Sequence, residues 1–145
     1  CISTLEHVGC DNSSYCTNDG KITNYKKNYD FLKAAKELLR VLAPRGKLLL
    51  TIPYGKYMHL GMIQQFDEEM LDLLMDAFRG YETECTFFKY EENGWQFSSM
   101  NECGDSIFVE WLTQSLMRGS FPNPHPVEKD MAAATRGLAC IRVNK

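Results

Sequence analysis

The segment Lys47–Ile52 restricts the folds open to this chain more than any other feature of the sequence. It reads Lys-Leu-Leu-Leu-Thr-Ile and lacks the polar–apolar alternation that marks a strand with one exposed face. The pattern therefore predicts a strand that is covered on both faces, as in a parallel sheet with helices on each side.

A helix is expected directly before this strand. Apolar residues recur there at helical spacing from about residue 28 onward, with Asp30 in the first turn. The recurring apolar residues are Phe31, Ala35, Leu38 and Leu42. Pro44 and Gly46 then end the helix. Residues 1–5 are a short apolar segment that predicts the end of another buried strand. Strand, helix and covered strand in this order predict an α/β fold with a mostly parallel sheet and helices on both faces.

The rest of the chain predicts further elements of one domain. We expect a second helix from an N-cap at Asp67 to Gly80, then a strand over residues 81–90 and a turn at Asn93-Gly94. A helix over residues 105–118, a loop over 120–126 and a final strand over 137–143 complete the pattern. The sequence shows no internal repeat and no clear domain boundary.

Composition argues against several functional classes. The 145 residues carry a net charge of −3, whereas nucleic-acid-binding domains usually carry a basic surplus. No apolar run approaches the length of about 18 residues that a membrane-spanning helix needs. The six cysteines include no CxxC pair, and a chain of this size can build a core without disulfides. We therefore expect a protein of the reducing cytoplasm that binds neither nucleic acid nor a membrane.

Polar side chains follow the two predicted strands at the points where these strands end. In open α/β sheets, ligands bind beyond the carboxyl ends of the strands. The first strand delivers residues 3–7 and the second delivers residues 51–55, so Glu6 and Tyr54 are expected to face one crevice. Tyr57 and His59 follow in the sequence and are further candidates for lining an acceptor pocket.

The motifs at these positions resemble the second half of the class I S-adenosylmethionine-dependent methyltransferases. The resemblance rests on Ser3-Thr4-Leu5-Glu6-His7-Val8, on the turn Leu42-Ala43-Pro44-Arg45-Gly46 and on the strand end Thr51-Ile52-Pro53-Tyr54-Gly55. Arg45 departs from the Leu-x-Pro-Gly-Gly form of that turn. Residues 137–145 resemble the antiparallel final strand of this family. The resemblance implies a partial Rossmann-like methyltransferase sheet.

The resemblance also implies roles for particular residues. Cys1, Ile2, Ser3 and Leu5 match positions that contact the methionine part of S-adenosylmethionine. Tyr54 and Gly55 at the end of the second strand, and Trp95 after a turn, are the candidate substrate-binding residues. The turn Asn93-Gly94-Trp95 is similar to that of a subgroup that modifies surface polysaccharides or small molecules. The family's glycine-rich cofactor turn, GxGxG, does not occur in these 145 residues. We therefore expect residues 1–145 to be the carboxyl-terminal part of one methyltransferase domain, inactive without an amino-terminal half as its partner.

Three interpretations of Glu6 and His7 stay open at the level of sequence. The pair caps the turn structurally, acts as the catalytic acid/base or substrate contact, or holds a divalent metal. Metal-binding relatives in the resembling family place a further Glu where this chain has Ser3, so no metal is expected. Structural capping is the simplest of these interpretations. For the catalytic interpretation, Glu6 and His7 are the candidate catalytic residues.

The sequence thus predicts methyl transfer from S-adenosylmethionine to the oxygen or nitrogen of a small-molecule or glycan acceptor. A non-catalytic, methyltransferase-like scaffold that binds a partner is the alternative. Another doubly wound enzyme, such as a dehydrogenase, would share the strand–helix–strand pattern, but it would not share the Leu5-Glu6-His7-Val8 motif.

Overall fold

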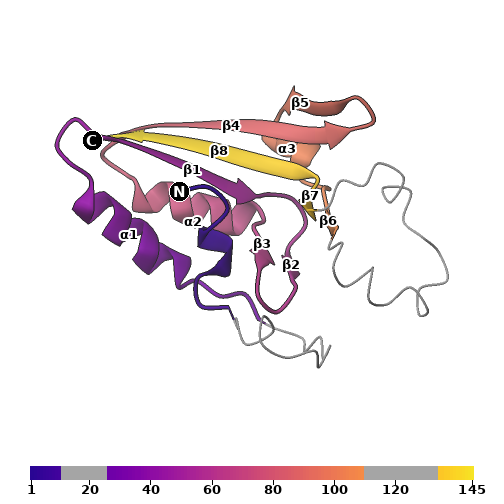
Figure 1. Ribbon diagram of the computed structural model, residues 1–145, viewed down its shortest axis with the longest axis horizontal. Helices are drawn as coiled ribbons and strands as arrows, with labels where there is room; N and C mark the ends of the chain where they lie inside the picture. Colours follow the sequence, from indigo (N-terminus) through magenta and orange to yellow (C-terminus); the bar gives the residue numbers. More distant parts are fainter. Residues whose placement is uncertain (11–25, 110–133) are drawn as a thin grey trace.

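The computed structural model describes residues 1–10, 26–109 and 134–145 (Figure 1). Within these ranges the main sheet has four strands in the order β1-β8-β4-β5. Their bounds are Lys47–Pro53 for β1, Gly137–Asn144 for β8, Glu82–Glu91 for β4 and Gly94–Ser98 for β5.

Every neighbouring pair in this sheet is antiparallel, so the predicted, mostly parallel Rossmann-like sheet is wrong. The reason is the position of β8, which lies between β1 and β4 and runs against both, with Leu50 and Cys85 both opposite Ile141. Strands β1 and β4 therefore point the same way without touching. Parallel pairing in the described ranges is limited to two single bridges, Ile2–Thr51 and Tyr54–Phe66.

The predicted strand at residues 1–5 is reduced to the single bridge at Ile2. Ser3 has a φ of 46°, which turns the chain away from β1. The 3-10 helix η1, Leu5–His7, follows at once. This turn carries Glu6 and His7 away from the sheet edge and down beside the helices.

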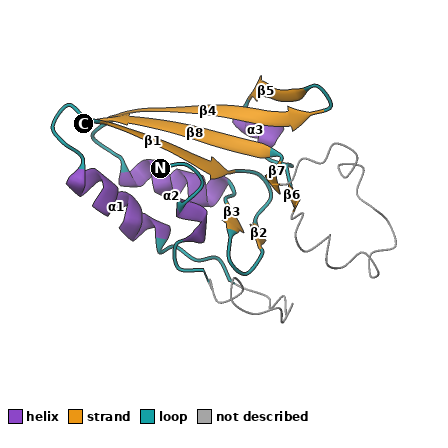
Figure 2. Ribbon diagram, viewed as in Figure 1, coloured by secondary structure: helices purple, strands orange, loops and turns teal. Residues whose placement is uncertain are grey.

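The helices cover one face of the sheet, and the expectation of helices on both faces is wrong for the described residues (Figure 2). The elements are α1 (Phe31–Val41), α2 (Glu68–Ala77) and the short α3 (Met100–Cys103). Their apolar side chains share one core with alternate residues of the strands, among them Leu50, Ile52 and Ile141. Leu49 points to the opposite face and is 60% exposed, so β1 is not covered on both faces.

Several predicted elements are confirmed. Asp67 is the N-cap of α2, and its carboxylate accepts a hydrogen bond from the Met70 N–H at 3.2 Å. The predicted turn connects β4 to β5, although its two residues are Glu92 and Asn93, and Gly94 already pairs with Glu91. The final strand is β8. Helix α3 was not expected, although its capping box of Ser99 and Glu102 is visible in the sequence.

The predicted helix over residues 105–118 is not formed in its described part. Phe108–Val109 is instead strand β6, which pairs with β7, Ala134–Thr135. Residues 110–118, the predicted loop over 120–126 and most of the polar segment 10–24 lie outside the described residues. A small hairpin of β2 (Met58–His59) and β3 (Gln64–Gln65) follows β1. No helix in the described ranges is long and apolar enough to cross a membrane.

Candidate functional site

The first three residues are fixed along the free edge of β1. The amino group of Cys1 donates to the Leu49 carbonyl at 2.8 Å, and the Thr51 N–H donates to the Cys1 carbonyl at 3.2 Å. The Ser3 N–H donates to the Thr51 hydroxyl at 3.1 Å. The two segments that resemble methyltransferase motifs therefore lie side by side.

The structure divides the predicted cofactor-binding residues into two groups. Cys1, Ile2 and Ser3 are exposed, with Ile2 at 77%, so their side chains are accessible to a ligand. Leu5 is 2% exposed and packs in the core with the helices. Leu5 thus anchors η1, and contact with a ligand is left to the exposed residues.

Glu6 is the middle residue of η1, and its side chain is enclosed. It is 1% exposed, and its Oε2 atom has no hydrogen-bond partner among residues 1–10, 26–109 and 134–145. Burial raises the pKa of this carboxyl, and backbone N–H groups, the charge of His7 and the Ser3 hydroxyl counteract the shift only in part. A carboxyl this deeply enclosed does not reach an acceptor in solvent without a rearrangement of η1.

His7 is placed differently. Its Nδ1 lies 2.7 Å from the carbonyl oxygen of Met62, in the loop between β2 and β3. Because a carbonyl only accepts hydrogen bonds, Nδ1 carries the proton, and in the neutral ring Nε2 keeps its lone pair. The half-buried imidazole is therefore oriented as a proton acceptor through Nε2.

Cys10 and His59 form a second contact close to Glu6. The Cys10 thiol donates to the Glu6 carbonyl at 3.4 Å and lies 3.9 Å from Nε2 of His59. The Gly61 N–H donates to Nδ1 of His59 at 3.1 Å, which places the ring proton on Nε2. Burial raises the pKa of Cys10 and lowers that of His59, so this is a neutral thiol–imidazole contact and not a thiolate pair.

Sequence reasoning named His59 and Tyr57 only as candidate pocket residues and did not single out Cys10. Within the described part of the chain, the buried Tyr57 hydroxyl has no hydrogen-bond partner. The amino group of Lys27 lies 5.4 Å from the centre of the Tyr57 ring. No spacing in the sequence signals this group, because Lys27 and Tyr57 come from distant segments that meet only in the folded chain.

The predicted substrate residues lie apart from Glu6 and His7. Tyr54 is 2% exposed, its ring packs at 5.2 Å from that of Phe87, and burial raises its pKa to about 12, with the charge of Glu68 the next cause. Gly55 is buried, and a Cβ there would lie 2.1 Å from the Ser106 carbonyl oxygen. Trp95 belongs to β5, at the sheet edge opposite β1 (Figure 1). The structure therefore does not gather these three residues around the η1 turn.

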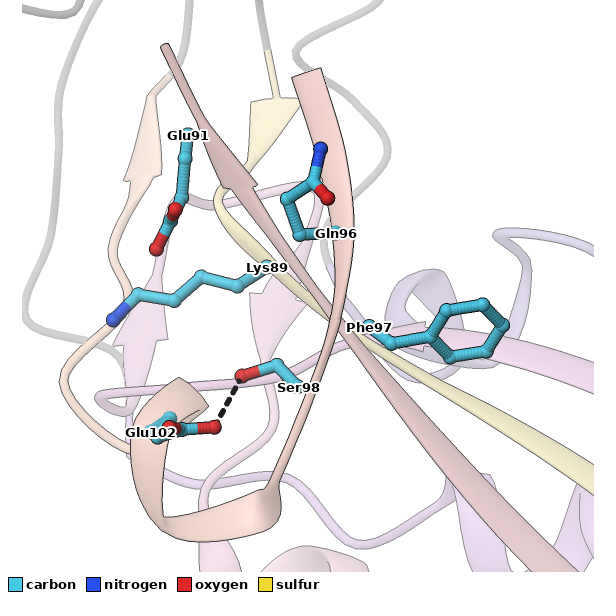
Figure 3. A pocket seen from close by; sticks show the side chains of 6 residues that line it. All are labelled: Lys89, Glu91, Gln96, Phe97, Ser98 and Glu102. Atoms are coloured by element: carbon cyan, nitrogen blue, oxygen red, sulfur yellow. Dashed lines mark hydrogen bonds between the residues drawn. The ribbon is translucent and has the colours of Figure 1, made fainter. Parts of the chain in front are cut away.

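A shallow hollow lies at the β5 edge, away from η1. It is lined by Lys89, Glu91, Gln96, Phe97, Ser98 and Glu102 (Figure 3). The Ser98 hydroxyl donates to Glu102 at 3.0 Å, and the Lys89 amino group lies on the same side of the hairpin. No group of three or more potential metal ligands occurs in the ranges that the structure describes.

Comparison with protein-family models, with curated proteins and with solved structures found no match for this chain.

Proposed function

We propose that this protein takes part in S-adenosylmethionine-dependent methyl transfer to an oxygen or nitrogen of a small-molecule or glycan acceptor. The observation that carries the proposal is the parallel bridge between Ile2 and Thr51. It aligns the segment before the Leu5-Glu6-His7-Val8 motif with β1, so the residues that resemble one family in sequence are neighbours in space.

The residues present fit this donor in part. Ile2 offers an exposed apolar side chain and Ser3 an exposed polar one, which suit the methionine portion of the donor. S-adenosylmethionine supplies a methyl group that is already activated on a positively charged sulfur, so the protein mainly has to align the acceptor and exclude water. The proposal requires a glycine-rich cofactor turn from outside these 145 residues, which contain no GxGxG.

We assign to His7 the role of general base, which accepts the proton that the methyl acceptor loses. Its Nδ1 proton is held by the Met62 carbonyl, so Nε2 is the atom that accepts a proton from the acceptor. Glu6 acts as a positioning residue beneath this turn, because its carboxyl is buried and its raised pKa favours the neutral form. We further propose the cytoplasm as the location, since the cysteines in the described ranges are free thiols.

Calorimetric titration with S-adenosylmethionine and S-adenosylhomocysteine tests the proposal. Two polypeptides are compared: the 145 residues, and a longer polypeptide that joins them to an amino-terminal segment carrying a glycine-rich cofactor turn. We expect no measurable binding by the first and saturable binding by the second. Failure of the longer polypeptide to bind either ligand would leave the non-catalytic scaffold as the better interpretation.

A matched pair of variants in the longer polypeptide locates the binding surface. Ile2→Arg introduces a bulky charge at the proposed site, and Val41→Arg does the same at an exposed apolar residue at the end of α1, which is 64% exposed. We expect Ile2→Arg to weaken binding by about tenfold or more, which corresponds to about 1.4 kcal/mol, while Val41→Arg leaves it unchanged. Equal effects of the two substitutions would contradict the proposed position of the ligand.

A further inference from the structure

The outer edge of β5 is an unprotected strand edge. Strand β5 reads Gly-Trp-Gln-Phe-Ser and contains neither a charged residue nor a proline, the usual means by which proteins block edge pairing. In the described ranges it pairs with β4 alone. The other edge of the sheet differs, because Cys1–Ser3 lie along β1. Among the residues that the structure describes, one edge is therefore partly covered, while the β5 edge has no strand beside it.

The pairing of β5 with β4 determines which N–H and C=O groups of β5 point toward β4 and which point outward. The Tyr90 N–H donates to the Arg136 carbonyl at 2.9 Å, on the β8 side of β4, so alternate residues such as Lys89 bond toward β5. Lys89 is opposite Gln96, which directs the N–H and C=O of Gln96 inward to β4. The N–H and C=O groups of Trp95 and Phe97 consequently point outward from the sheet.

This edge is complementary to itself. When two copies of β5 lie antiparallel and are centred on Gln96, Trp95 of each copy is opposite Phe97 of the other. Both of these pairs use the outward-pointing backbone groups, so the two strands form four hydrogen bonds. Gln96 is then opposite the partner's Gln96 in the pair that makes no backbone hydrogen bonds.

The aromatic side chains favour the same register. Trp95 packs against Tyr90 at 5.3 Å between ring centres, and Phe97 packs against Phe88 at 4.7 Å, all on the face without helices. Phe97 is 81% exposed and Trp95 46% exposed. In the paired arrangement, each row runs Tyr90, Trp95, the partner's Phe97 and the partner's Phe88. Aromatic cross-strand pairs of this kind stabilise antiparallel sheets.

The polar face of β5 does not oppose this pairing. Gln96 projects from the strand on the side opposite Phe97, toward Lys89 and the hollow (Figure 3). Across the new strand pair, Gln96 meets the partner's Gln96 and Ser98 meets the partner's Gly94. No like charges are directly opposite, whereas such contacts would be destabilising.

We propose that two copies of this protein associate through antiparallel pairing of their β5 strands, centred on Gln96, to form one continuous sheet. The partner is thus a second copy of the chain. The interface consists of one short strand and two aromatic rows, so it is smaller than the interfaces of permanent dimers. Association is therefore weak and depends on concentration.

Sedimentation equilibrium over roughly 10 µM to 1 mM measures this association, because weak dimers dissociate in that range. We expect a monomer–dimer equilibrium that Phe97→Lys shifts toward monomer by about tenfold or more in the dissociation constant. Leu49→Lys is the matched control, since Leu49 is also an exposed apolar residue on the open face but lies on β1. A monomer throughout the range, or equal effects of both substitutions, would overturn the proposal. Far-ultraviolet circular dichroism checks that both variants keep the fold.

A disulfide cross-link tests the register. The Cα atoms of an antiparallel pair without backbone hydrogen bonds are about 4.5 Å apart, a separation that a disulfide spans. Gln96→Cys should therefore yield a covalent dimer under mild oxidation, with the 96–96 link identified by mass spectrometry of the cross-linked peptide. Asn101→Cys, at an exposed position in α3, is the control and should give no such dimer. Equal cross-linking at both positions would contradict pairing through β5.

Discussion

Truncating two neighbouring leucines of β1 measures which face of the sheet is covered. Leu50 is 1% exposed in the core, while Leu49 is 60% exposed on the opposite face. Each Leu→Ala change removes three carbon atoms, worth about 2.4 kcal/mol when fully buried. For Leu50, the cavity left in the core raises the loss of unfolding free energy to about 3–4 kcal/mol. For Leu49, which is only two-fifths buried, the loss is about 1 kcal/mol.

Urea denaturation followed by far-ultraviolet circular dichroism measures both variants. With a slope of about 1–3 kcal/mol per molar urea, the difference of about 2 kcal/mol separates the two midpoints by about 1 M. The chemistry of the two substitutions is the same and the strand is the same, so the comparison depends on burial alone. Equal losses, within about 0.5 kcal/mol, would show that the face of Leu49 is also packed and that the reasoning is wrong.

Three further predictions concern single residues. Burial raises the pKa of Glu6 above the ordinary 4.5 in the folded protein. As the pH rises, the unfolded chain therefore loses the Glu6 carboxyl proton at a lower pH than the folded chain does. The free energy of unfolding should therefore fall by about 1.4 kcal/mol per pH unit between the unfolded and folded pKa values, and urea titrations of Glu6→Gln should lack that slope. Gly55→Ala places a Cβ 2.1 Å from the Ser106 carbonyl oxygen and should lower the free energy of unfolding by about 3 kcal/mol or more. Gly80 has a φ of 96° and no neighbour within 4 Å, so Gly80→Ala should lower it by only about 1 kcal/mol. Thermal unfolding compares the two variants. Lys145→Met removes two 2.7 Å hydrogen bonds that the Lys145 amino group donates to carbonyls at the end of α1, so it should lower the unfolding free energy by about 1–2 kcal/mol. Amide hydrogen exchange in the last turn of α1 should become faster. Unchanged exchange would contradict a capping role for Lys145.

Local features of the chain were predictable because their causes are local. The stripe that includes Phe31 and Ala35 forms α1, and Asp67 caps α2, as expected from spacing and capping chemistry. The turn between β4 and β5, one residue before its predicted position, and the final strand follow in the same way. Each of these features depends on residues that are close together in sequence.

The site was predictable only in outline. The sequence predicted that residues 1–7 lie next to β1, and the Ile2–Thr51 bridge agrees with this prediction. It did not indicate that Ser3 would turn the chain, that Glu6 would be enclosed, or that Cys10 would meet His59. These outcomes depend on contacts between segments about fifty residues apart, which no local pattern records.

The sequence by itself located α1, α2, β1, β4 and β8 and showed which residues are apolar. Only the tertiary structure decided how the strands pair and which faces are covered. A run such as Leu48-Leu49-Leu50 suits burial on either face, and the insertion of β8 between β1 and β4 then makes both of its pairings antiparallel. With α1 and α2 on one face only, three of the four aliphatic residues of β1 (Leu48, Leu50 and Ile52) face the core, and Leu49 remains exposed. Hydrophobicity specifies that a residue can be buried, while the partner that buries it comes from a distant part of the chain.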